Sequence, residues 1–145
     1  MIKGELIMKN FIKIIALALV AVIACATLAS CALGAPNADP EKAEKSLEKK
    51  GYVVDVADDK VSLGLVALST GLSDLECVIT AFNEEDKEDA VMIYYFEDKE
   101  VADEAWEKYF EKAAEKVKED NKDVIVKKSG KMIWVGTKAA INAAK

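Results

Sequence analysis

The sequence predicts an α+β fold of two layers, in which an antiparallel sheet of about five strands carries helices mainly on one face. Two observations predict it. Pairs of apolar segments joined by short polar connections indicate hairpins, which build antiparallel ladders. Between them, apolar residues recur every three or four positions, which indicates amphipathic helices that need a sheet face to cover. Residues 39–145 are enough for one such domain with its own core.

A helix begins the domain. Asp39 suits the N-cap, Pro40 suits the first helical position, and Gly51 suits the position just past the end. The segment 52–56, which reads Tyr-Val-Val-Asp-Val, then predicts a strand.

Residues 58–75 fit two structures. Five apolar residues fall at helical spacing, namely Val61, Leu65, Leu68, Leu72 and Leu75. Gly64 and Gly71 oppose a long helix. We therefore expect a short helix here.

Two strands and the longest helix follow. Residues 76–83 and 90–96 predict strands joined by the acidic loop Glu84–Asp89. Residues 98–120 predict a helix, because one apolar stripe runs along it. The stripe consists of Ala102, Ala105, Trp106, Tyr109, Phe110, Ala113, Ala114 and Val117.

A second hairpin, with strands 123–128 and 131–135, turns at Ser129-Gly130. This turn places Val126 opposite Ile133 and Val124 opposite Val135, and these four residues form the core face. The other face is mixed and uncovered in a two-layer fold, which makes it a candidate partner surface. That surface consists of Ile125, Met132 and Trp134. A last helix then begins at an N-cap, Thr137.

Charge and composition narrow the function. Three of the 20 lysines and one of the 26 acidic residues lie in residues 1–30, which leaves 17 positive and 25 negative charges from residue 31 onward, a net charge of −8. Such an acidic body is repelled by nucleic acid, so we expect no nucleic-acid partner. The chain has no histidine and no arginine. It therefore lacks the commonest general base and the bidentate phosphate clamp, which lowers the expectation of an enzyme.

The N-terminus resembles a bacterial lipoprotein signal peptide. Three lysines, Lys3, Lys9 and Lys13, precede the uncharged apolar segment 14–27. The segment ends in Leu28-Ala29-Ser30-Cys31, which is similar to a lipobox at every position. The resemblance implies a signal peptide over residues 1–30, diacylglycerol in thioether linkage to Cys31, and a tether over residues 31–38. It implies a protein on the extracytoplasmic face of the cell membrane, held there by the lipid.

Three alternatives stay open for this segment. The uncharged stretch 14–35 has the length of an uncleaved membrane anchor. Cleavage after Ala32 would give a secreted protein, since Ser30 and Ala32 are both small. Cys31 is otherwise an ordinary small residue of an apolar helix.

The segment Gly130–Thr137, Gly-Lys-Met-Ile-Trp-Val-Gly-Thr, resembles that of small Gram-positive lipoproteins of unknown function. This resemblance implies no particular activity. The leading hypothesis is a non-enzymatic, lipid-anchored envelope protein that binds another protein or a small ligand. The alternatives are an envelope hydrolase that uses two carboxylates and a structural subunit of a membrane complex.

Individual residues predict no catalytic site, no metal site and no cofactor. Cys77 lies in an apolar run and has no histidine to activate it, so we expect a buried, inert thiol. The loop Glu84–Asp89 lacks the alternating acids and central glycine of a calcium loop. Gly136-Thr137 at a helix start predicts a cap more than an anion site.

Overall fold

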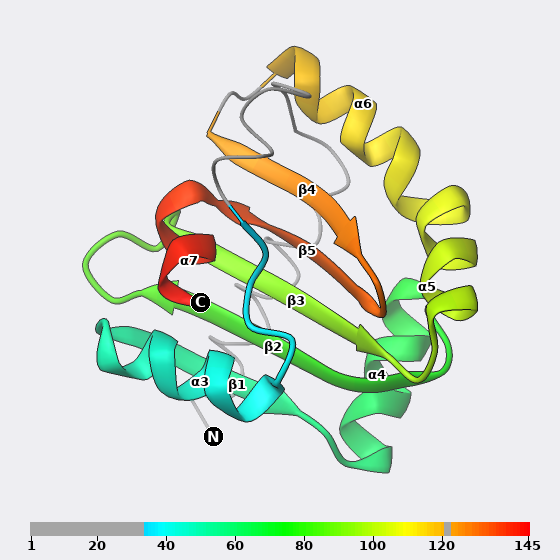
Figure 1. Cartoon of the computed structure of the whole chain (residues 1–145), viewed down its shortest axis with the longest axis horizontal. Coiled ribbons are helices and arrows are strands. Elements are labelled where there is room, and N and C mark those ends of the chain that lie inside the picture. The colour runs from blue at the N-terminus through cyan, green and yellow to red at the C-terminus, as the bar shows by residue number, and fades with distance from the viewer. Residues whose placement is uncertain (1–33, 121–122) are drawn as a thin grey trace.

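An antiparallel sheet of five strands lies at the centre of the computed structural model, in the order β1-β2-β3-β5-β4 (Figure 1). The strands are β1 (Tyr52–Ala57), β2 (Leu75–Asn83), β3 (Ala90–Phe96), β4 (Val124–Ser129) and β5 (Met132–Thr137). The structure describes residues 34–120 and 123–145, so the predicted signal peptide and Cys31 lie outside the described residues. The α+β class and the antiparallel sheet of five strands are confirmed.

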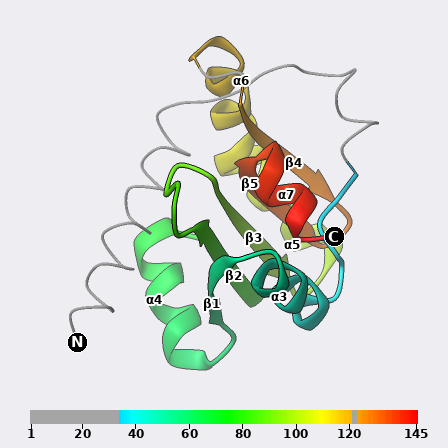
Figure 2. The ribbon, with the colours of Figure 1, turned by 90° about the vertical axis from the view of Figure 1, so that its left-hand side faces the viewer.

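Helices cover both faces of the sheet. They are α3 (Pro40–Lys49), α4 (Lys60–Thr70), α5 (Lys99–Ala105), the π-helical turn η1 (Trp106–Phe110), α6 (Glu111–Asp120) and α7 (Lys138–Ala143). α3 and α7 lie on one face, and α4 lies on the other (Figure 2). This corrects the expectation of two layers with helices mainly on one face. The physical reason is that β3 is buried along its whole length, so its apolar side chains need cover on both sides.

Two separate apolar cores result, one on each face. Leu47 of α3 and Ile141 of α7 pack over Ile93 of β3 on the first face. On the second face, α4 and the helices from α5 to η1 pack over Met92, Tyr94 and Phe96, the alternate residues of the same strand. Tyr94 meets Phe110 of η1 edge to face, with ring centroids 5.4 Å apart.

Short polar side chains begin the helices. Asp39 accepts from the backbone N–H of Glu41 at 3.0 Å, and Thr137 accepts from that of Ala140 at 3.2 Å, which confirms both predicted N-caps. Residues 60–70 form a helix of eleven residues, which settles the ambiguity of this segment. Its N-cap is Asp59, and the hydrogen bonds from Ser62 hold the pKa of that carboxyl below its ordinary value.

The hairpin β4–β5 keeps the predicted faces but differs in register by two residues. Val126 pairs with Val135, and Ser129 pairs with Met132, so the turn is Gly130-Lys131 rather than Ser129-Gly130. A shift of two leaves each side chain on its predicted side of the sheet. The four predicted core residues, Val124, Val126, Ile133 and Val135, therefore share the face of α4 and α5.

The second half of the predicted tether lies against the domain. Pro36 is buried, and Ala35 packs on the core beneath α3 and α7. The backbone N–H of Asn37 donates to the carbonyl of Ala144 at 2.8 Å. The Tyr95 hydroxyl donates to the carbonyl of Asn37, also at 2.8 Å. The fixed part of the chain therefore starts close to Ala35.

Candidate functional site

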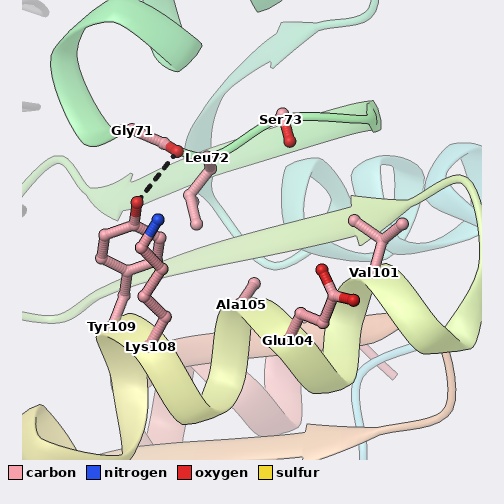
Figure 3. A pocket seen from close by; sticks show the side chains of 8 residues that line it. All are labelled: Gly71, Leu72, Ser73, Val101, Glu104, Ala105, Lys108 and Tyr109. Carbon is pink, nitrogen blue, oxygen red and sulfur yellow. Dashed lines mark hydrogen bonds between the residues drawn. The ribbon is translucent and has the colours of Figure 1, made fainter.

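A small pocket lies where the end of α4 faces the helix α5 and its π-helical turn (Figure 3). Its volume is about 100 Å³. The lining residues are Gly71, Leu72, Ser73, Val101, Glu104, Ala105, Lys108 and Tyr109. Sites for drug-sized ligands are about 300–1,000 Å³, so this pocket suits one side chain or a few waters.

Gly71 shapes the pocket. It ends α4 in the left-handed conformation, with φ at +78°, which favours glycine. Its carbonyl accepts from the Tyr109 hydroxyl at 3.3 Å, a bond that joins the α4 end to the π-helical turn (Figure 3). A Cβ on Gly71 would lie 3.0 Å from that hydroxyl oxygen. The pocket therefore depends on a glycine at this position.

The π-helical turn Trp106–Phe110 sets the other wall. Such a turn adds one residue to a helix and is frequent at functional sites. Phe110 is buried, whereas Trp106 and Tyr109 are only half-buried. The predicted stripe placed all three in the core, and Trp106 and Tyr109 pack against that core at its margin.

Two charged side chains rise from the helix toward the loop at the pocket (Figure 3). The Lys108 ammonium lies 5.1 Å from the centre of the Tyr109 ring, within the range of a cation–π contact. Glu104 supplies the pocket's carboxylate. The hydrolase alternative needs two carboxylates on one site, and this pocket has one among its lining residues.

An exposed apolar stripe runs along α4 beside the pocket. Val61, Leu65 and Leu68 are 75%, 59% and 86% exposed. Their spacing of four and three residues places them on one side of the helix. Val66 is the buried residue of α4 and faces the sheet. Single exposed apolar residues are ordinary, but three on one helix face form a patch of the kind that binds partners.

The stripe was within reach of sequence reasoning. Its three residues belong to the helical pattern found in residues 58–75, but the pattern alone does not say which side is covered. The decisive signal is that α4 has no charged residue after Lys60, so it lacks the charged side that a surface helix usually turns to solvent.

The predicted partner surface lies in a different place. Met132 and Trp134 are buried beneath the α3 and α7 layer, and Ile125 is half-buried at the margin of the same core. The expectation that this sheet face is uncovered is therefore corrected. Trp134 is 3% exposed, and its Nε1 has no hydrogen-bond partner in the described structure.

Burial and hydrogen bonds within the fold account for Cys77 and for Asp89 of the acidic loop. Burial, reinforced by the nearby charge of Asp58, raises the pKa of the Cys77 thiol to about 11. In the loop, Asp89 accepts from the Tyr52 hydroxyl at 2.6 Å and from the Thr137 hydroxyl. It therefore ties β1 to the start of α7. No three potential metal ligands cluster within residues 34–120 and 123–145.

Comparison with known proteins gives no match to a family model, to a curated protein or to a solved structure. Within the described residues, every helix is too short or too polar to cross a bilayer.

Proposed function

We propose that this protein is anchored by a lipid on Cys31 to the extracytoplasmic face of the cell membrane, where it acts as a binding module for a partner protein. The lipobox-like segment Leu28-Ala29-Ser30-Cys31 supports the anchor. The exposed stripe on α4 carries the binding function, since a folded domain leaves such a patch uncovered at a cost in solubility.

The pocket beside the stripe adds a place for specificity. A partner that covers Val61, Leu65 and Leu68 could place one side chain between Gly71 and Tyr109. Interfaces gain much of their affinity from one anchor residue in a pocket, surrounded by contacts that exclude water. The stripe and the pocket together therefore resemble a docking site more than a site for chemistry.

Intact mass of the protein from native membranes tests the anchor. We expect a chain that begins at an acylated Cys31, and we expect C31A to accumulate as an unprocessed precursor. A mature N-terminus at another residue, or an unmodified Cys31, would contradict the proposal.

Comparison of variants tests the binding function. Proteins recovered with the wild-type chain from native membranes are compared with those recovered by L65D/L68D and by the matched control K42D, on α3. We expect loss of a specific protein with the α4 variant alone. Equal recovery with all three chains would contradict a docking role for α4.

A further inference from the structure

The anchor is short once the fixed residues are counted. The chain is held to the domain from Ala35 onward by burial of Pro36 and the two hydrogen bonds of Asn37. Only residues 32–34 separate Cys31 from Ala35. This segment can reach at most about 14 Å when fully extended.

α4 lies on the far side of the sheet from these residues. Figure 2 shows the first described residues on the side of α3 and α7, with α4 across the sheet. A helix with its side chains is about 10–12 Å across, and the spacing from one layer to the next adds about 10 Å more. The outer stripe of α4 is therefore beyond the reach of a bilayer that holds Cys31.

The distribution of charge also favours an orientation in which the α3 and α7 side faces the membrane. The elements on the anchored side, residues 34–50 and 138–145, contain six lysines and four acidic side chains. The elements that cover the other face, residues 58–74 and 98–110, contain three lysines and eight acidic side chains. Anionic lipid headgroups attract the first surface and repel the second.

We propose that the side formed by α3 and α7 faces the membrane, and that the α4 stripe points away from it and docks a helical segment of a partner protein. This inference rests on the proposed lipid anchor. The segment is apolar along one face, to cover Val61, Leu65 and Leu68, as in other helix-in-groove contacts. It carries lysine or arginine at its flanks, because exposed Asp58, Asp59 and Asp74 stand at the two ends of α4. Lys60 at one end and Lys108 of the pocket at the other offset only part of this negative charge.

Two other occupants fit the geometry less well. The bilayer is out of reach for the reason given above. A second copy anchored in the same membrane would present its own stripe outward in the same direction, so two stripes could not meet face to face.

Orientation is tested with the lipidated protein in vesicles that contain anionic lipids and a spin-labelled lipid headgroup. A fluorophore is attached to K42C on α3 or to S69C on α4, and buried Cys77 serves as the unreactive background. We expect the spin label to quench K42C several-fold more strongly than S69C. Stronger quenching of S69C, or equal quenching of both, would overturn the orientation.

Flotation of the same vesicles is measured first. Failure of the protein to float with the vesicles would refute the lipid anchor, and so the proposed function itself. Flotation with the wrong quenching pattern would refute only the orientation.

The occupant is tested by a benzophenone amino acid in place of Leu68, with Lys42 as the control position, in cells that make the full chain. We expect light to join position 68, and not position 42, to a protein segment that is apolar on one helical face with basic flanks, as read by mass spectrometry. A cross-link to lipid, to a second copy or to an acidic segment would overturn the proposal, as would no cross-link at all.

Discussion

Truncation of Trp134 to alanine tests whether its side chain is buried between the sheet and α7. The indole is 3% exposed and belongs to the same core as Ala140 and Ile141 of α7. Removal of a buried tryptophan side chain costs about 3–5 kcal/mol in transfer free energy and cavity formation. Because Ile141 is itself fully buried, its neighbours have little freedom to fill the space.

The unpaired Nε1 of Trp134 modifies this estimate. A buried donor without a partner costs about 1–3 kcal/mol, and truncation removes that cost along with the ring. We therefore expect W134A to lower the free energy of unfolding by about 3 kcal/mol, the low end of the range. W134F keeps most of the ring and loses the N–H, so its effect should stay within about 1.5 kcal/mol in either direction.

Urea unfolding of the domain from Gly34 onward, followed by far-ultraviolet circular dichroism, measures these differences. A shift in the midpoint at constant slope reports a change in stability. L68A is the matched control, because Leu68 is 86% exposed and its truncation should change the free energy by at most about 0.5 kcal/mol. If W134A moves the midpoint as little as L68A does, the indole is outside the core and the reasoning fails.

The remaining predictions concern backbone, thiol and phenol groups. G64A should raise the free energy of unfolding by about 0.5–1 kcal/mol, since nothing lies within 4 Å of its added Cβ. G71A should lower the free energy of unfolding by about 1–2 kcal/mol, because Gly71 has a positive φ. Urea unfolding measures both variants, and midpoints of G64A and G71A that move in the same direction would contradict the prediction. Cys77, with a pKa near 11, should react slowly with a thiol reagent at neutral pH until the domain unfolds, and rapid labelling of the native protein would refute its burial. Burial raises the pKa of Tyr94, so the unfolded chain loses the phenol proton at a lower pH than the folded domain does. The free energy of unfolding should therefore fall as the pH rises above about 10. A free energy of unfolding that stays constant up to about pH 11 would refute this prediction.

The sequence was sufficient for the order of the elements because their signals are local. Asp39 before Pro40 and Thr137 before an alanine-rich segment are caps that act within one turn, so no distant contact is needed to recognise them. The period of two along β4 and β5 likewise assigned each side chain to its face. The register of that hairpin was missed by two residues, because both Ser129-Gly130 and Gly130-Lys131 are compatible with a tight turn.

The sequence does not predict which helices cover each face of the sheet, because that covering depends on distant parts of the chain. Alternation in the second hairpin separated Val126 and Ile133 from Met132 and Trp134, but it contains no information on whether a helix lies over the second pair. Here α7 is only six residues long, and so short a helix has too weak an apolar pattern to indicate which sheet face it covers. The π-helical turn was missed for a related reason, since one added residue leaves most of the spacing of three and four intact.

The site on α4 shows how a failure of pattern reasoning can itself be informative. Helix prediction relies on a polar side facing water, and Val61, Leu65 and Leu68 occupy the place where that side should be. The segment therefore looked ambiguous, although it forms a regular helix between Asp59 and Gly71. Consistency among propensity, pattern and burial is what specifies a fold, and departures from it are expected where a protein serves something other than its own stability. A helix that caps well at both ends and yet turns leucine to solvent is such a departure. The proposed partner would restore the consistency by covering these side chains.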